Sequence, residues 1–120
     1  MKTNQQVWER YVAAWRAPTL EEKRALLLEA VSPACVYTDP SARLHGHGAL
    51  IEYMLAFHRQ VPGGHFVTEQ FFAHHQQSAA RWTMRGPDSE ILGDGVSHGA
   101  YDEGGQLVQM TGFYDPPGAD

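Results

Sequence analysis

The sequence predicts an α+β fold in which a cone-like, curved antiparallel sheet wraps around three helices of the N-terminal half. Two observations carry this prediction. Apolar residues recur at three- and four-residue spacings in the first half of the chain, and they alternate with polar residues in the second half. Glycines also interrupt one of the long predicted strands, which is typical of bulges and bends. A sheet bent in this way can enclose an apolar pocket.

Three helices are predicted from the helical spacing of apolar residues and from the residues that begin and end a helix. The first covers residues 4–16. Thr19 and Glu22 form a capping box at the start of the second, which runs to about residue 30. The residues expected to form its buried stripe are Leu20, Leu27, Leu28 and Val31. The third helix follows a loop marked by Gly46 and Gly48 and ends at about residue 60.

Strands are predicted where apolar and polar residues alternate between turn signals. They cover residues 35–39, 65–73, 79–85, 91–101 and 107–114. In the strand at 79–85, Trp82 and Met84 share one face, and Arg81 and Arg85 share the other. This alternation predicts a sheet with one covered and one solvated face.

Length and composition indicate a single domain, with a tail at about residues 115–120 that is expected to fray because its prolines cannot extend a strand. The net charge of −5 argues against a nucleic-acid partner and against an anionic membrane surface, since both select clustered Lys and Arg. The sequence shows no secretory leader and no stretch of the length that spans a bilayer, which favours a cytoplasmic protein.

No metal and no cofactor is expected from the residue types present. Cys35 is the only cysteine and lies in an apolar strand, where a buried, unreactive thiol is expected. The close histidine pairs are His45 with His47 and His74 with His75. Both pairs lie in predicted loops or turns and lack the helical spacing or the cysteine partners of common metal sites. We therefore expect solvated histidines.

Large apolar side chains are numerous enough either to fill a core or to line a pocket, and the sequence leaves both interpretations open. They are Trp15, Phe57, Trp82, Met84, Met110 and Tyr114. Tyr37 on the first strand, with Tyr53 and Met54 on the third helix, are further candidates for the pocket wall. A carboxylate, Asp39, ends the first strand, and a phenol, Tyr11, lies on the first helix. The two can converge on the same pocket.

Four stretches of the chain resemble the nuclear transport factor 2-like superfamily, in particular its SnoaL-like and ketosteroid-isomerase-like branch. They are Glu9–Trp15, Val36–Pro40, Gly46–Phe57 and Gly104–Met110 together with Phe113. The resemblance spans nearly the whole chain and implies a cone-like barrel around a hydrophobic pocket and a homodimer formed through the sheet. This superfamily includes isomerases, polyketide cyclases, epoxide hydrolases, dehydratases and proteins without known chemistry, so the fold does not settle the function.

The resemblance implies a role for several residues. Asp39 matches the general base of ketosteroid isomerases, and Tyr11 matches the phenol that stabilises the enolate oxygen. Two positions depart from the pattern. Ser97 stands where a protonated aspartate is expected and is a weaker donor, and Met54 replaces a tyrosine of the third helix, next to Tyr53. Efficient steroid isomerisation is therefore not expected, whereas proton transfer on another carbonyl compound, or cyclase chemistry, stays open.

Both central residues also have structural interpretations. An Asp-Pro at a strand end, such as Asp39-Pro40, is a common turn device because the carboxylate accepts local backbone N–H groups. A tyrosine on a buried helical stripe, such as Tyr11, is often part of the core. An epoxide-hydrolase site needs an Asp-Arg-Asp set, but Arg81 and Arg85 are expected to face away from the cavity.

The sequence therefore predicts a small-molecule pocket protein for an apolar compound. As an enzyme it is a cofactor-independent isomerase or cyclase, with Asp39 as base and Tyr11 as hydrogen-bond donor. The alternative is a non-catalytic ligand-binding or dimerisation module of the same fold. A third hypothesis, a protein-binding adaptor like nuclear transport factor 2 itself, requires an exposed apolar patch.

Overall fold

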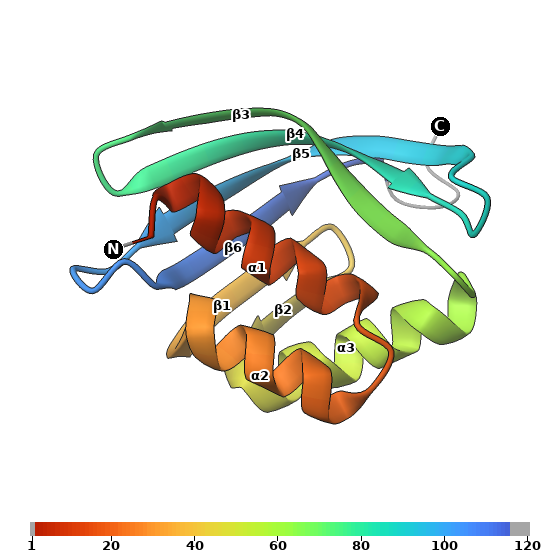
Figure 1. Ribbon diagram of the computed structural model, residues 1–120, viewed down its shortest axis with the longest axis horizontal. Coiled ribbons are helices and arrows are strands. Elements are labelled where there is room, and N and C mark those ends of the chain that lie inside the picture. Colours follow the sequence, from red (N-terminus) through yellow and green to blue (C-terminus); the bar gives the residue numbers. More distant parts are fainter. Residues whose placement is uncertain (1, 116–120) are drawn as a thin grey trace.

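The computed structural model describes residues 2–115 and confirms the predicted α+β fold (Figure 1). In this part of the chain, three helices pack against one side of a curved six-stranded sheet. The helices are α1 (Asn4–Arg16), α2 (Leu20–Ala30) and α3 (Gly46–Gln60). The strands are β1 (Val31–Asp39), β2 (Ala42–His45), β3 (His65–His74), β4 (Gln77–Arg85), β5 (Ile91–Tyr101) and β6 (Leu107–Phe113). Apart from Asp115, the tail expected to fray lies outside the described residues.

The sheet is mixed rather than purely antiparallel. Its strands follow the order β2-β1-β6-β5-β4-β3. Neighbouring strands are antiparallel except β1 and β6, which run parallel. The parallel pair arises because the chain returns to β1 only after passing through α3 and the β3–β5 meander. The sequence also missed β2, which is only four residues long, and placed a loop where α3 begins. Gly46 has a left-handed φ of +85°, which lets the chain turn directly from β2 into α3.

The long strands β3 and β4 arch over α1, while α2 and α3 lie farther from that arch (Figure 1). Strand pairing shifts between Thr68 and Gln70 and again between Met84 and Arg85. The second shift lies beside Gly93 on the neighbouring strand. An extra residue on one strand increases the local twist and bends the sheet, so these shifts help the sheet to curve over the helices.

The hydrophobic core fills the space between the helices and the sheet. Its most deeply buried apolar side chains are Val31, Cys35, Leu27, Leu50, Ile51, Met54, Leu107 and Met110. Burial raises the pKa of the Cys35 thiol above its ordinary value, which disfavours the reactive thiolate. The only cysteine of the chain is thus a core residue in the structure.

The buried stripe of α2 differs from the predicted one. Leu27 and the following Val31 are fully buried, but Leu20 and Leu28 are 38% and 60% exposed. Leu28 lies about 100° around the helix from Leu27, which turns it away from the core. The surprise is Lys23, which is fully buried one turn before Leu27. The buried face of α2 therefore contains a lysine, whereas two of the leucines predicted for that face are exposed.

Lys23 links the three helices through its amine. Its Nζ donates to the carbonyl oxygens of Ala14 at 2.8 Å and Trp15 at 3.4 Å, and lies 2.9 Å from Nε2 of His58. Ala14 and Trp15 lie in the last turn of α1, whose carbonyl groups have no partner within the helix. Lys23 therefore caps α1 from α2. Burial lowers the pKa of Lys23 to about 8, and burial together with Lys23 lowers the pKa of His58.

This lowered pKa predicts that Lys23 makes a contribution to stability that rises with pH in a defined window. Above about pH 8 the folded chain releases the Lys23 proton, whereas the unfolded chain keeps it up to an ordinary pKa of 10.5. The contribution of Lys23 to the free energy of unfolding should therefore increase by about 2 kcal/mol between about pH 8 and 9.5. Buried Cys35 and the buried tyrosines, whose pKa values are raised, lower the stability of every variant over the same range, so the contribution is measured as a difference between two variants in urea unfolding. Lys2→Met, which replaces the other lysine, an exposed one, should gain stability relative to Lys23→Met by this amount across the window. A difference between the two variants that does not change with pH would contradict the assignment.

Candidate functional site

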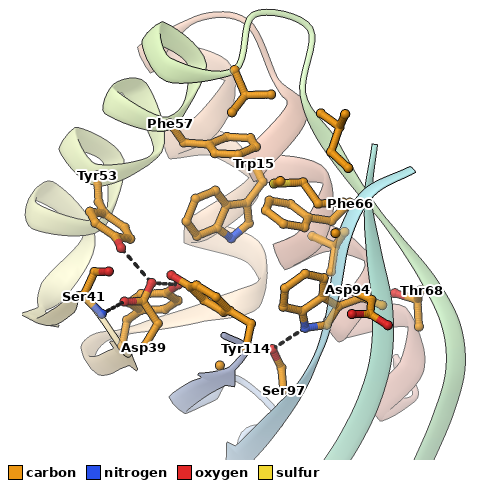
Figure 2. Close-up of a pocket in the computed structure, with 18 of the residues that line it drawn as sticks. Trp15, Asp39, Ser41, Tyr53, Phe57, Phe66, Thr68, Asp94, Ser97 and Tyr114 are labelled. Atoms are coloured by element: carbon orange, nitrogen blue, oxygen red, sulfur yellow. Dashed lines mark hydrogen bonds between the residues drawn. The ribbon is translucent and has the colours of Figure 1, made fainter. Parts of the chain in front are cut away.

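A cavity of about 590 Å³ lies between α1, α3 and the helix-facing side of the sheet (Figure 2). The residues predicted for the pocket wall that line it are Trp15, Tyr37, Tyr53, Phe57, Trp82, Met84 and Tyr114. The three predicted catalytic residues, Asp39, Tyr11 and Ser97, line it as well. The sequence left open whether the large side chains fill the core or surround a space, and in the structure these seven surround a space.

Met54 and Met110 belong to the core, which corrects their assignment to the pocket wall. Met54 is fully buried and Met110 is 1% exposed, and neither lines the cavity. On α3, Tyr53 precedes Met54, and consecutive side chains point about 100° apart around a helix. Tyr53 therefore reaches the cavity while Met54 packs into the core. On β6, Met110 pairs with Tyr37 and Gly99 in the middle of the sheet, beneath the helices.

Asp39 ends β1 and accepts three hydrogen bonds at the wall of the cavity (Figure 2). Its Oδ2 accepts from the phenols of Tyr37 and Tyr53, each at 2.7 Å. Its Oδ1 accepts from the backbone N–H of Ser41 at 2.8 Å. The Ser41 contact is the local turn that Asp-Pro sequences favour. The phenol contacts come from residues of the cavity wall, so one carboxylate belongs both to the turn and to the cavity.

The phenols around Asp39 are strong candidates for hydrogen-bond donors. Burial is the main cause that raises the pKa of Tyr11, Tyr37 and Tyr53 above the ordinary value of 10. The negative charge of Asp39 raises the pKa of all three further, because a phenolate beside a carboxylate is repelled. Burial also raises the pKa of Tyr114, whose ring lies beside Asp39 (Figure 2). These hydroxyls therefore stay protonated at neutral pH and can donate.

Tyr11 lines the same cavity as Asp39 but is not one of the phenols that hold it. Tyr11 is 4% exposed and lies on α1. Among the described residues, the two phenols bonded to Asp39 are those of Tyr37 and Tyr53. The sequence therefore identified the carboxylate, whereas its bonded partners come from its own strand and from α3.

Ser97 lies on β5 and is tied to Trp82. The indole Nε1–H of Trp82 donates to Oγ of Ser97 at 2.9 Å (Figure 2). A serine oxygen that accepts can still donate its own hydrogen, so Ser97 can offer a hydrogen bond to a ligand. Gly112 of β6 lies between Ser97 and Asp39. A side-chain carbon there would be 3.7 Å from Asp39 Cβ and 3.7 Å from Ser97 Oγ, and its absence keeps this part of the wall open.

Several lining residues were missed by the sequence interpretation, among them Phe66, Thr68 and Asp115. Phe66 and Thr68 pair with Met84 and Trp82 across β3 and β4, so the period-two pattern of β3 was the signal that could have found them. Within the described part of the chain, Oγ1 of Thr68 is buried without a hydrogen-bond partner. A ligand or a water that supplies a hydrogen-bond partner to such an atom removes the free-energy cost of leaving it unpaired.

The cavity wall contains acidic groups and no basic ones among the residues that the structure describes. Its carboxylates belong to Asp39, Asp94 and Asp115. Asp94 is exposed and lies at the edge of the wall. Arg81 contacts Gln70 at 2.9 Å, and Arg85 contacts Glu69 at 2.9 Å, outside the cavity. The Asp-Arg-Asp set of an epoxide hydrolase is therefore not assembled there.

The histidines do not gather into a metal centre within the described residues, where no group of three or more His, Cys, Asp or Glu side chains is placed to hold an ion. His47 contacts the carbonyl oxygen of Val31 at 2.8 Å, and His74 lies against His75 at 3.1 Å. None of the described helices has the length and apolarity needed to cross a membrane.

Solved structures with the same fold include three bacterial proteins. A proposed isomerase of the SnoaL-like family from Agrobacterium tumefaciens superposes with a TM-score of 0.87 at 23% identity, covering 97% of this chain and 100% of its own. A proposed SnoaL-like polyketide cyclase from Jannaschia gives 0.76 at 16% identity, covering 93% and 85%. A proposed polyketide cyclase from Sinorhizobium meliloti gives 0.71 at 15% identity, covering 92% and 99%. At these identities the likeness establishes the fold alone.

The family assignment comes from the sequence itself. The model of the SnoaL-like domain matches residues 8–114, a span that contains most of α1, all the remaining helices and strands, and the cavity residues from Trp8 to Tyr114. No curated protein matches the chain. The chain belongs to the SnoaL-like domain family.

Proposed function

We propose that this protein binds an apolar carbonyl compound in the cavity and moves a proton at the carbon next to the carbonyl, as a cofactor-independent isomerase or cyclase. Asp39 is the general base, Tyr11 donates a hydrogen bond to the developing enolate oxygen, and Ser97 is a second, weaker donor. The observation that supports this proposal best is a carboxylate on the wall of a 590 Å³ cavity whose other walls are largely aromatic. A carboxylate held against an apolar ligand can remove a proton from it.

The arrangement of donors and acceptor fits this chemistry. Asp39 and Ser97 flank Gly112, so a ligand that lies over Gly112 can contact both side chains. Tyr11 and Ser97 both line the cavity, and donors aimed at a developing negative charge lower the barrier to its formation. The structural relatives described as a proposed isomerase and as proposed polyketide cyclases favour the same two classes of reaction.

One observation favours a second candidate function, a ligand-binding module without catalysis. The carboxylate of Asp39 already accepts hydrogen bonds from Tyr37, Tyr53 and Ser41. These donors occupy acceptor positions of the carboxylate and hold it in one orientation. A carboxylate held in this way can orient a ligand without taking a proton from it.

An exchange experiment separates the two functions. The protein is incubated in heavy water with a panel of apolar cyclic ketones, and NMR follows the loss of the protons next to the carbonyl. Exchange faster than in the same concentration of acetate supports the enzyme. Ketone binding without faster exchange supports the ligand-binding module. If no ketone of the panel binds and none exchanges, both proposals for this cavity are contradicted.

We also propose that a second copy of the chain is the macromolecular partner, bound through the outer face of the sheet. Val96 and Phe113 are opposite each other on β5 and β6 and are 43% and 60% exposed. Burial of such side chains in an interface is favourable. Sedimentation equilibrium should show a dimer for the wild-type chain. The double variant Val96→Ser, Phe113→Ser should have a larger dimer dissociation constant, so that it is already monomeric at protein concentrations where the wild-type chain is dimeric. A monomeric wild-type chain at high concentration would contradict this proposal.

A further inference from the structure

The electrostatic character of the cavity is unusual for a space lined by so many apolar side chains. Three carboxylates line it, those of Asp39, Asp94 and Asp115, and no Lys, Arg or His lines it within the described chain. Asp39 is the carboxylate held deepest among aromatic rings, whereas Asp94 and Asp115 are exposed at the rim. The buried Lys23 does not balance them at the wall, because its amine contacts α1 carbonyl groups and His58.

Aromatic rings make up most of the remaining wall near Asp39. Trp15 packs against Tyr37 and Tyr53 with ring centroids 5.9 and 6.1 Å apart, and Tyr37 packs against Tyr53 at 5.6 Å. Tyr114 lies on the other side of the carboxylate (Figure 2). The faces of aromatic rings attract cations, and this attraction strengthens where water is excluded. The carboxylate and the aromatic rings therefore both favour a positively charged ligand.

Charge should consequently decide which apolar ligands enter. Two like charges a few ångströms apart repel strongly where water is scarce, and opposite charges attract with similar strength. An anionic ligand would find no cation on the described wall to compensate its lost hydration. A cationic ligand would find the Asp39 carboxylate, whose Oδ1 has one hydrogen bond, from Ser41, and can accept another.

We propose that the cavity selects its ligand by charge: it binds an apolar compound that carries an ammonium group in preference to the matching alcohol, and it excludes the matching carboxylate. The ammonium group donates to Asp39, and the apolar body packs against Trp15, Phe57 and Phe66. This inference rests on the proposed function in taking the cavity as the ligand site, and it does not depend on any reaction there.

Three probes with one apolar body test the proposal. They are 1-adamantanemethylammonium, 1-adamantanemethanol and 1-adamantanecarboxylate, which differ chiefly in charge at pH 7. All three tryptophans of the chain, Trp8, Trp15 and Trp82, line the cavity, so tryptophan fluorescence reports binding by probes that do not absorb, and calorimetry measures the dissociation constants. We expect the ammonium to bind at least about tenfold more tightly than the alcohol, and the carboxylate at least about tenfold more weakly.

Variants assign the preference to its source. Asp39→Asn should reduce the ratio of ammonium to alcohol affinity toward one, and Asp88→Asn, a matched change of an exposed carboxylate outside the cavity, should leave it unchanged. If Asp39→Asn does not fold, the three wild-type affinities still decide. Equal affinities, or a carboxylate that binds as well as the alcohol, would overturn the proposal. The ketone exchange assay uses uncharged ligands, so loss of exchange and loss of charge selection can be told apart.

Discussion

Asp39→Asn is expected to slow the proton exchange of an apolar ketone by about 100-fold or more, because a positioned general base contributes on that order to such a reaction. Asparagine keeps the shape of the side chain and an oxygen that can accept from the Ser41 N–H, but it cannot take a proton at neutral pH. The rate is measured by NMR in heavy water at saturating ketone. Asp88→Asn is the control with the same chemical change outside the cavity.

Two tyrosine variants distinguish a general base from a carboxylate that only shapes the site. Tyr11→Phe removes the proposed donor to the enolate and should lower the maximal exchange rate by about tenfold or more while ketone affinity changes little. Tyr53→Phe removes one of two phenols from Asp39 and should cost less, because Tyr37 still holds the same oxygen at 2.7 Å. Exchange in Asp39→Asn at the wild-type rate would contradict the assignment of Asp39 as the base.

Local sequence signals were enough to predict most of the elements. The first helix begins and ends where the apolar spacing predicted, because Thr3 and Gln6 form a capping box at its start and the following segment contains Pro18. The strand β5 also has its predicted bounds, Ile91–Tyr101. The capping residues of α1 lie within a few positions of each other, and β5 is joined to β6 by a short antiparallel connection, so a sequence pattern records the signals for both elements directly.

Features that depend on the tertiary arrangement were not predictable in the same way. Lys23 resembles any exposed lysine in sequence, and its burial becomes reasonable only when α1 ends against it with unpaired carbonyl groups. The strand β2 is stabilised by its pairing with β1 rather than by an alternation of its own. The parallel pairing of β1 with β6 joins residues such as Thr38 and Thr111, which no local pattern connects.

The candidate site shows the same division between local and tertiary information. Asp39 was found because a carboxylate before a proline at a strand end is visible in sequence. Its partner Tyr37 is two residues away on the same strand, but Tyr53 comes from α3, and Met54 was placed beside it in the wall although it packs into the core. A helix that faces both core and cavity divides adjacent residues between them, so the identity of the lining residues depends on how α3 is rotated.

Gly95→Ala is expected to destabilise the fold by about 3 kcal/mol and to disturb the cavity, because the indole of Trp82 and the end of β6 occupy the space where a side chain would lie. A Cβ at Gly95 would come within 2.7 Å of Cη2 of Trp82 and 2.6 Å of the carbonyl oxygen of Phe113. The carbonyl belongs to the sheet and cannot move away as a flexible side chain can. Overpacking of this kind typically costs about 1–3 kcal/mol, and we expect Gly95→Ala to lie near the upper end of this range.

The indole of Trp82 is the part of this contact that can move, and its movement is measurable. A displaced indole loses its hydrogen bond to Ser97, now 2.9 Å long, and enters the cavity, so the tryptophan emission should shift and the adamantane alcohol should bind more weakly. Gly93→Ala is the matched control: it lies two residues away on the same strand, and its nearest neighbour would be Cε of Met84 at 3.8 Å. We expect urea unfolding to place Gly93→Ala within about 0.5 kcal/mol of the wild type. Equal stability of the two variants would mean that Trp82 is not held against Gly95, and the wall of the cavity on the β4–β5 side would then not be rigid enough to position Ser97 for a ligand.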